Sequence, residues 1–308
     1  MTQNLKFSHK ILLAASLVVI VAFSLFTLYN DYLQRNAIRA DLEDELKSLG
    51  SVTASNIQSW LSGRILMTES LAQSIDAETT PDALGKLLGR RAFTNTFVFT
   101  YLGSADGVMT MHPNNTLPEN YDPRTRPWYK DAMAAGGSTL TEPYVDAATG
   151  ALIMTIATPA GSNGVIGGDL SLETLVQIIN SLDFGGMGYA FLISADGKIL
   201  VHPNKDQVMK NLKDIYPQNT PIIGDAISEG ELDGKTRILT FTKVKGLPSV
   251  DWYIGLSIDK DKAYASLTGF RTSAVIATLV AVFSIMVLLS MLIRVLMQPL
   301  HTMGRTMR

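Results

Sequence analysis

The residue types best suited to ligand chemistry lie between Tyr121 and Asp169. The segment Tyr121–Asp131 (YDPRTRPWYKD) places two arginines, two prolines and three aromatic residues within eleven positions. The sequence Tyr144-Val-Asp146 follows, and Asp169 comes directly after two glycines in a strand-like run. Charged and aromatic residues gathered in this way are typical of a binding site.

The chemistry of these side chains favours a ligand that carries both charges. The forked donors of Arg126 can hold a carboxylate, and the Trp128 indole N–H and nearby tyrosine hydroxyls donate from apolar walls. Asp146 and Asp169 only accept hydrogen bonds when ionised, so they suit an ammonium group. We therefore predict a clamp for a zwitterion. The alternative is a surface turn held by a structural Arg–Asp ion pair.

A repeated segment indicates the fold that positions these residues. Ser104–Asn114 and Ser194–Asn204 share Ser-Ala-Asp-Gly and His-Pro-Asn at an offset of 90 residues. In each copy the Asp-Gly lies between two strand-like runs, which predicts a tight hairpin. Strand pairs follow downstream, at 153–159 with 165–171 and at 237–244 with 252–258. Each copy is thus predicted to form an antiparallel sheet with helices, an α+β fold.

Helices are predicted before, between and after the two copies. Residues 31–72 should form one long helix, with an apolar stripe that passes through Leu46, Leu49 and Val52. A second helix, at 172–182, should connect the copies, and a third, at 259–271, should leave the second copy. His112 and His202 occupy equivalent positions beside proline in the repeat, where we expect a structural role in the turn.

The composition separates the two ends of the chain from its middle. The chain has 308 residues, 46% hydrophobic and 18% charged, compared with about 25% charged in an average soluble domain. No acidic residue occurs in 1–29 or 273–308, so the middle holds all 28 acidic residues but 21 of the 26 basic ones, a net charge of −7. This acidic middle disfavours nucleic acid as a partner. The absence of cysteine excludes disulfides and cysteine-based metal sites.

Two uncharged runs, at 11–29 and 273–293, are each long enough to cross a ~30 Å hydrocarbon core as a helix. A cleaved signal peptide is the alternative for the first run, and a buried core helix for the second. The first run lacks a small-x-small cleavage site and continues as helix. Basic residues flank both runs on their terminal sides, which predicts cytoplasmic ends and an outer segment at 30–272. These residues are Lys6, Lys10, Arg294, Arg305 and Arg308.

The whole chain resembles the sensory half of a methyl-accepting chemotaxis receptor with a double Cache (dCache) domain, and especially the Pct-type amino-acid chemoreceptors of pseudomonads. The resemblance runs from Leu5-Lys-Phe-Ser-His-Lys10 through Tyr-Val-Asp and Gly-Gly-Asp-Leu-Ser to Met297-Gln-Pro-Leu300. It implies two PAS-like antiparallel-sheet modules behind a long N-terminal helix. We call residues of about 73–182 the first module, expected to be membrane-distal, and residues of about 183–258 the second, expected to be membrane-proximal.

The resemblance also implies roles for single residues of the first module. Arg126 and Trp128, with help from Tyr121, would hold the ligand carboxylate. Tyr144, Asp146 and Asp169 would hold the α-ammonium, and Tyr129 would line the site. The second module lacks counterparts of Arg126, Trp128 and Asp146, so we expect it to bind no ligand. The loop Gly161-Ser-Asn-Gly164 is shorter than in some relatives, and the ligand profile of a relative is therefore not carried over.

The function implied is that of a non-enzymatic chemoreceptor in the cell inner membrane, with two spans and a periplasmic ligand-binding domain. Its ligand would be an L-amino acid, with γ-aminobutyrate or a related amine-carboxylate as the alternative. We expect a homodimer that signals to cytoplasmic chemotaxis proteins through an output domain after residue 308. Residues 1–10 would be a cytoplasmic N-terminus, and residues 294–308, with Pro299, would begin a HAMP linker.

Other classes of protein share parts of this pattern. The same outer domain could belong to a histidine kinase or a diguanylate cyclase, and a transport-linked binding component is a third alternative. No nucleotide-binding, hydrolase or metalloprotease motif is found in the sequence. Calcium at Asp131, Asp146 and Asp169 is disfavoured by the nearby arginine and aromatic residues. No metal and no cofactor are expected.

Overall fold

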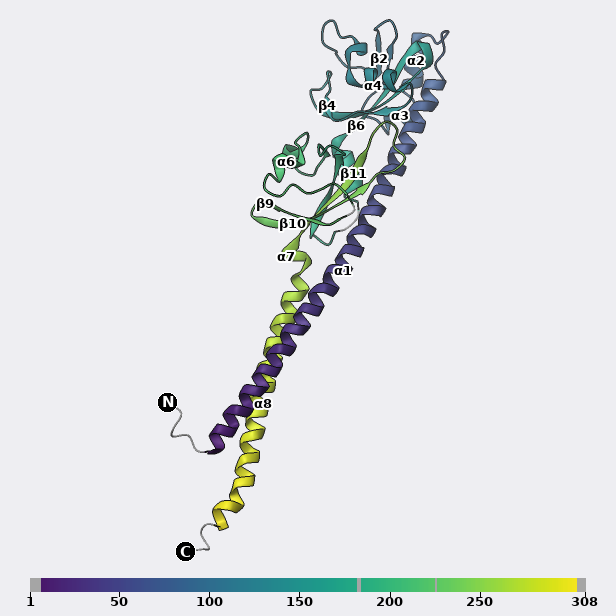
Figure 1. The fold of residues 1–308 in the computed structure, drawn as a ribbon. Helices are drawn as coiled ribbons and strands as arrows, with labels where there is room; N and C mark the ends of the chain where they lie inside the picture. Colours follow the sequence, from purple (N-terminus) through teal and green to yellow (C-terminus); the bar gives the residue numbers. More distant parts are fainter. Residues whose placement is uncertain (1–6, 182–183, 225, 304–308) are drawn as a thin grey trace. The chain divides into compact units, whose positions relative to one another are not determined.

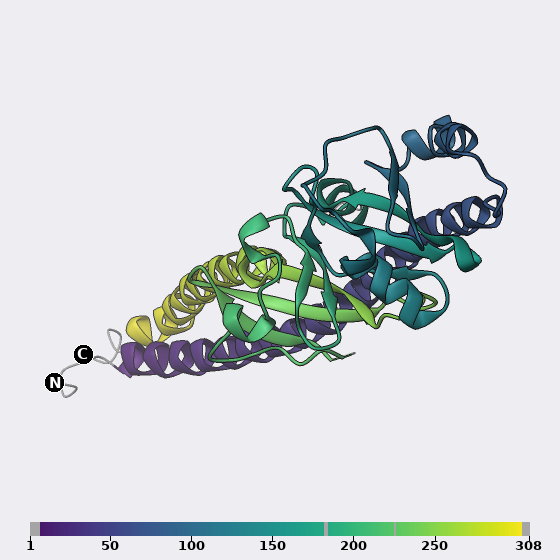
Figure 2. The same cartoon turned by 90° about the horizontal axis from the view of Figure 1, so that it is seen from above.

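The computed structural model describes residues 7–181, 184–224 and 226–303, which belong to two compact units. The central unit comprises Asp44–Lys260, and the terminal unit combines the segments before and after it. The strands of the first module are teal and those of the second module green in Figure 1, and Figure 2 shows the same elements from above. The predicted α+β class, with a long N-terminal helix and two antiparallel sheets, is confirmed.

The elements have the following bounds. The α-helices are α1 (Phe7–Gln73), α2 (Pro81–Leu88), α3 (Arg91–Thr94), α4 (Pro127–Ala135), α5 (Leu172–Ile179), α6 (Leu212–Ile215), α7 (Lys260–Ala263) and α8 (Ala265–Met303). Short 3-10 helices are η1 (Pro123–Thr125), η2 (Gly161–Asn163) and η3 (Lys205–Gln207). The strands of the first module are β1 (Thr100–Ser104), β2 (Met109–His112), β3 (Thr139–Leu140), β4 (Tyr144–Val145), β5 (Leu152–Pro159) and β6 (Gly164–Ser171). Those of the second are β7 (Gly188–Ser194), β8 (Ile199–Val201), β9 (Ser228–Leu232), β10 (Lys235–Lys243) and β11 (Trp252–Asp259).

The two sheets repeat one topology. The first has the order β2-β1-β6-β5-β3, with β4 also paired to β5, and the second has the order β8-β7-β11-β10-β9. All of these pairs are antiparallel. The two Asp-Gly sequences form the β1–β2 and β7–β8 turns, so both predicted hairpins are confirmed. Gly107 and Gly197 have positive φ values of 93° and 89°, which these turns require.

The long helix α1 packs on both sheets through one apolar stripe. The buried positions include Leu46, Ile57, Leu61 and Ile65, which are spaced by three or four residues or multiples of them. The predicted stripe was wrong in its middle part, because Val52 is 44% exposed and the stripe passes through Gly50 instead. A Cβ atom at Gly50 would overlap the side chain of Thr242 in β10, so only glycine allows this close approach.

The terminal unit contains two helices that are long and apolar enough to cross a membrane. One is the N-terminal part of α1, and the other is the stretch Thr272–Leu292 of α8. Their large apolar side chains face outward, as shown by Leu25 and Leu279, which are 62% and 66% exposed. The hydroxyls of Thr27 and Thr278 lie 3.5 Å apart, which brings the two helices into contact.

Some predictions extend beyond the described residues. The connecting helix α5 ends at Ile179, three residues before the predicted end at 182, which itself lies outside the described residues. Residues 1–6 and 304–308 also lie outside them, and so do Lys6, Arg305 and Arg308 of the charge argument. The predicted helix at 259–271 corresponds to α7 and the start of α8.

Candidate ligand-binding site

Three elements of the first module carry five of the seven predicted site residues, and Tyr121 and Asp146 lie in loops beside η1 and β4. Arg126, Trp128 and Tyr129 lie at the start of α4, Tyr144 lies in β4, and Asp169 lies in β6. Proline at the first position of a helix suits its fixed φ, and it forces the residue before it to be extended. Arg126 therefore caps α4 with φ −79° and ψ 150°, and Trp128 and Tyr129 follow within the first turn.

Asp169 is a buried carboxylate, only 1% exposed. Its Oδ1 atom accepts hydrogen bonds from the Tyr101 hydroxyl at 2.7 Å and from Thr155 Oγ1 at 2.7 Å. Burial raises the pKa of Asp169 to about 7, although both hydrogen bonds oppose this and the Asp146 charge adds to it. An ammonium group beside Asp169 would favour the ionised form and lower its pKa.

A chain of hydroxyl groups links Asp169 to β4. The Tyr144 hydroxyl lies 2.6 Å from Thr155 Oγ1, which in turn donates to Asp169. Burial, and after it the charge of Asp169, raises the pKa of the Tyr144 hydroxyl, so this group remains protonated. The chain fixes Tyr144 next to the carboxylate and leaves its ring face free to meet Arg126.

Arg126 lies against the ring of Tyr144. Its Cζ atom is 5.6 Å from the centre of the Tyr144 ring, and its Nη2 atom donates to the Val145 carbonyl at 2.8 Å. Its Nε atom is buried without a hydrogen-bond partner among the described residues. An unsatisfied buried donor on a cation is costly unless an acceptor reaches it. Arg126 can therefore still donate to an anionic group.

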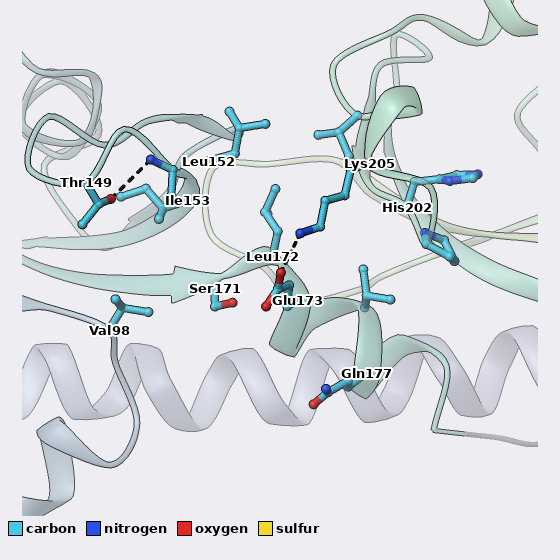
Figure 3. Close-up of a pocket in the computed structure, with 14 residues that line it drawn as sticks. Val98, Thr149, Leu152, Ile153, Ser171, Leu172, Glu173, Gln177, His202 and Lys205 are labelled. Carbon is cyan, nitrogen blue, oxygen red and sulfur yellow. Dashed lines mark hydrogen bonds and ion pairs between the residues drawn. The ribbon is translucent and has the colours of Figure 1, made fainter.

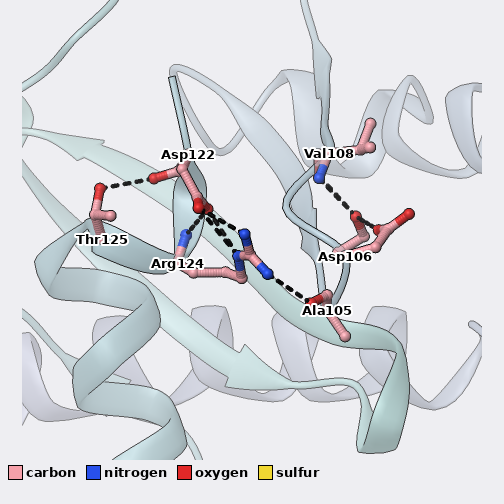
Figure 4. Close-up of polar contacts among 7 residues, drawn as sticks. Ala105, Asp106, Val108, Asp122, Arg124 and Thr125 are labelled. Atoms are coloured by element: carbon pink, nitrogen blue, oxygen red, sulfur yellow. Dashed lines mark hydrogen bonds and ion pairs between the residues drawn. The ribbon is translucent and has the colours of Figure 1, made fainter. Parts of the chain in front are cut away.

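The other arginine of the motif has a structural role. Arg124 donates to both carboxylate oxygens of Asp122, at 3.0 Å from Nε to Oδ1 and 2.7 Å from Nη2 to Oδ2, and to the Ala105 carbonyl at 3.4 Å (Figure 4). The structural Arg–Asp pair that the sequence left open thus exists, but it involves Arg124. It fastens η1 to the β1–β2 turn and leaves Arg126 available.

Aromatic rings form the walls around these polar groups. Trp128 is 1% exposed and meets Tyr101 edge to face, with 4.9 Å between ring centres, and Tyr129 at 5.6 Å. Burial raises the pKa of Tyr121, the charge of Arg126 and a hydrogen bond with Trp128 lower it, and Asp169 and Asp146 raise it slightly. Tyr121 therefore lies within electrostatic reach of both charged ends of the site.

Asp146 is more constrained than the sequence suggested. Its Oδ2 atom accepts from the Thr149 backbone N–H at 2.9 Å and from Thr149 Oγ1 at 2.5 Å. The carboxylate thus belongs to the turn between β4 and β5, and it acts on Asp169 through its charge. Among the described residues, no group of three or more histidine, aspartate or glutamate side chains is arranged to hold a metal ion.

Sequence reasoning missed Tyr101 and Thr155, which both bond to Asp169. A signal for each was present, because β5 and β6 were predicted as a pair, and their register places Thr155 directly opposite Asp169. Tyr101 lies opposite Gly167. A Cβ atom at Gly167 would overlap the Tyr101 ring, so the missing side chain at this position, two residues before Asp169, is what lets the ring pack against β6.

The second module has different residues at the equivalent positions. Ser257 of β11 takes the place of Asp169, and Phe191, opposite Gly255, takes the place of Tyr101. The Arg237 side chain donates to Ser257 Oγ at 3.0 Å and to the Ser257 carbonyl at 2.8 Å. Its Cζ atom also lies 5.3 Å from the centre of the Tyr189 ring. A cation from the chain itself therefore lies where a ligand ammonium would otherwise be expected.

Comparison with known proteins finds a matching family and several similar chemotaxis proteins. The sequence profile of the dCache_1 family, described as a Cache domain, matches residues 34–267. The methyl-accepting chemotaxis protein PctB of Pseudomonas aeruginosa is 62% identical over 312 aligned positions, which cover all of this chain and 50% of PctB. The chain spans about half the length of the curated relatives it matches.

Solved structures of ligand-binding domains are also similar. The PctB domain in complex with L-Arg has 60% identity and a TM-score of 0.72, and the match covers 73% of this chain and 98% of that one. The CtaA domain of Pseudomonas fluorescens with L-serine has 56% identity, a TM-score of 0.69 and coverages of 72% and 99%. The PctC domain of P. aeruginosa with GABA has 44% identity, a TM-score of 0.65 and coverages of 71% and 100%.

Proposed function

The chain belongs to the dCache_1 family of Cache domains, and from this premise we propose that its first module binds a small zwitterion, an L-amino acid. The observation that carries the proposal is that Asp169, through Thr155, and Arg126, directly, both meet Tyr144. The first is a buried carboxylate that accepts hydrogen bonds from Tyr101 and Thr155 at the same oxygen, Oδ1. The second is a guanidinium with a buried donor still to be satisfied.

In this proposal each pole of the site takes one charged group of the ligand. Asp169 accepts hydrogen bonds from the ammonium, with Tyr144 beside it and the Asp146 charge behind it. Arg126 and the Trp128 indole hold the carboxylate, and Tyr121 lies within electrostatic reach of both poles. Tyr129 completes the aromatic wall. The apolar cluster that includes Phe99, Tyr101 and Val165 supports this wall from below.

The related domains were solved with two kinds of ligand, which differ in the distance between the charged groups. The PctB and CtaA domains were solved with L-Arg and L-serine, and they share more of their sequence with this chain than the PctC domain, which was solved with GABA. An α-amino acid holds its charged groups closer together than γ-aminobutyrate does. We therefore propose L-amino acids as the ligand class and keep γ-aminobutyrate as the alternative.

Isothermal titration calorimetry on residues 30–272 tests this function, with the twenty L-amino acids and γ-aminobutyrate as titrants. The related domains were solved as separate chains, so this segment is a suitable sample. We expect binding of at least one L-amino acid and its loss in Asp169→Ala. The matched control is Asp251→Ala, because Asp251 is an exposed aspartate paired with Lys243 in the second module. Binding that is undiminished in Asp169→Ala would contradict the clamp.

The membrane arrangement is also part of the proposal. Residues 11–29 and 273–293 would span the cell inner membrane with both ends in the cytoplasm, and residues 30–272 would lie in the periplasm. The two long apolar helices support this topology. Fusion of alkaline phosphatase after residue 150 or after residue 300 tests it, since only the first fusion should be active. Activity of the second fusion would place the C-terminal end outside.

The relatives' names support chemotaxis over an enzymatic output, since PctB is named as a methyl-accepting chemotaxis protein. We propose that the protein acts as a homodimer and passes the signal through a HAMP linker that begins near residue 294 to cytoplasmic chemotaxis proteins. Ligand binding would shift the last strands of the second module and the helix that follows. Taxis toward the ligand should disappear when the gene is deleted, and unchanged taxis would remove the support for this role.

A further inference from the structure

A cavity of about 690 Å³ lies between the two modules, and neither Asp169 nor Arg126 lines it. Its walls come from the end of the β4–β5 turn, the start of α5 and the segment that contains η3 (Figure 3). This volume is within the range of small-molecule sites. The lining residues are Val98, Thr149, Ala151, Leu152, Ile153, Ser171, Leu172, Glu173, Val176, Gln177, His202, Pro203, Lys205 and Val208.

The walls of this cavity are mostly apolar and uncovered. Val98 and Leu152 are 43% and 39% exposed, although both carry branched apolar side chains inside a concave surface. Val176 and Val208 continue this surface from α5 and from the second module. Apolar surface left open to water in a concavity of this size favours an apolar occupant.

The ionisable groups of the lining leave no free charge for a ligand. Glu173 and Lys205 pair with each other across the module boundary, with 2.6 Å between Oε1 and Nζ (Figure 3). His202 is buried, and its Nδ1 atom accepts from the Asn204 backbone N–H at 2.9 Å. Burial lowers the pKa of His202 to about 4, so its ring is neutral near pH 7. A charged ligand would have to break the ion pair or remain unpaired in an apolar cavity.

We propose that this cavity between the modules is a second binding site, which takes an uncharged and mainly apolar small molecule. The site differs from the clamp at Asp169 in position and in ligand chemistry. Its occupant would touch both modules, so it would favour whichever arrangement of the two binds it better. It would also touch Thr149, whose backbone N–H and hydroxyl hold Asp146.

Three probes that share one ring system and differ in charge test the ligand class. They are 1-naphthalenemethanol, 1-naphthoate and 1-naphthylmethylammonium, titrated by calorimetry into residues 30–272. We expect one equivalent of the alcohol to bind, and both ions to bind about tenfold more weakly or not at all, because an unpaired charge loses its hydration in an apolar cavity. Equal or tighter binding of either ion, or no binding of the alcohol at its solubility limit, would overturn the proposal.

A cavity-filling variant tests the location of the probe. Val176→Trp places an indole in the cavity and should abolish binding of the alcohol. The control is Thr174→Trp, because Thr174 is an exposed residue on the same helix that does not line this cavity. If Val176→Trp does not fold, as judged by circular dichroism, Val208→Trp fills the same space from the second module. Binding of the alcohol that survives in the folded variant refutes this location.

A charge variant gives a result that depends on the ion pair itself. In Glu173→Gln, Lys205 loses its partner, and the affinity for naphthoate should rise about two- to fivefold, the range expected for an exposed ion pair. The matched control is Glu142→Gln, which breaks the second ion pair between the modules, Glu142 to Lys198 at 2.6 Å, outside the cavity lining. An increase in both variants, or in neither, would contradict the argument from charge.

Discussion

The buried carboxylate of Asp169 makes folding of the ligand-free domain depend on pH. Burial raises its pKa from the ordinary 3.8 to about 7, and at about 1.4 kcal/mol per pH unit this increase corresponds to about 4 kcal/mol. Because the folded state has the higher pKa, the stabilisation is complete below the unfolded pKa and is lost as the pH rises through the folded pKa. Between pH 5 and pH 8 the domain should lose about 3 kcal/mol of unfolding free energy through this group.

Asp169→Asn isolates this contribution. Asparagine has the same shape and still offers an oxygen to Tyr101 and Thr155, but it does not ionise. Urea unfolding of residues 30–272 at pH 5, 6, 7 and 8, without ligand, gives the free energy for each protein. The variant should gain about 3 kcal/mol relative to the wild type as the pH rises from 5 to 8, since all other titrating groups are shared.

The control for this series is Asp251→Asn, because Asp251 is 65% exposed and its ion pair with Lys243 is screened by water. Its stability relative to the wild type should change little over the same pH range. A constant difference between Asp169→Asn and the wild type from pH 5 to pH 8 would refute the reasoning, since it would mean that the Asp169 carboxyl does not change its charge state there. A difference of the opposite sign would mean that a cation of the protein stabilises the ionised form.

Three further outcomes follow from the same geometry. The affinity for an amino-acid ligand should rise about tenfold from pH 6 to pH 8, as the ionised fraction of Asp169 goes from about 0.1 to about 0.9; calorimetry measures this, and a flat profile would exclude Asp169 as the ammonium partner. Tyr101→Phe should weaken the same binding by about tenfold, because it removes a hydrogen bond to a charged group, and an unchanged affinity would leave Tyr101 with only a packing role. Gly167→Ala should destabilise the domain by about 1–3 kcal/mol in urea unfolding through overlap with the Tyr101 ring. The control Gly63→Ala, in open space on α1, should stabilise it by up to ~1 kcal/mol, so equal effects of the two substitutions would contradict the overlap.

The fold was predictable where local signals decide it. The Asp-Gly turns fix the β1–β2 and β7–β8 hairpins, and the duplicated segment predicts that both modules share one topology, as the strand orders confirm. The stripe on α1 was less predictable. Val52 fits the helical spacing, but the small size of Gly50 is what lets β10 approach the helix. A tertiary contact of this kind leaves no periodic signal in the sequence.

The sequence indicated the charged and aromatic residues of the candidate site, but it did not indicate the residues that hydrogen-bond to Asp169. Arg126 and Asp169 were predicted because a forked cationic donor and a carboxylate acceptor suit the two charged groups of a zwitterion. Thr155 and Tyr101 are ordinary strand residues, so only the register with β6 reveals their bonds to Asp169. The cavity between the modules could not be predicted, because its walls come from segments up to about 110 positions apart, Val98 to Val208, and depend on how the modules pack.

The two copies of the repeat differ in how the charge at one equivalent position is balanced. A buried carboxylate without a cation is costly, so burial raises the pKa of Asp169 to about 7 and leaves the group about half protonated at neutral pH unless a cation arrives. At the equivalent position the second module has neutral Ser257, and the chain supplies its own cation, Arg237, to the Ser257 oxygens. At this position the second module therefore already holds a cation, whereas in the first module a bound ammonium would pair with the Asp169 carboxylate and stabilise it. It follows that ligand should raise the stability of the domain more at pH 8 than at pH 6.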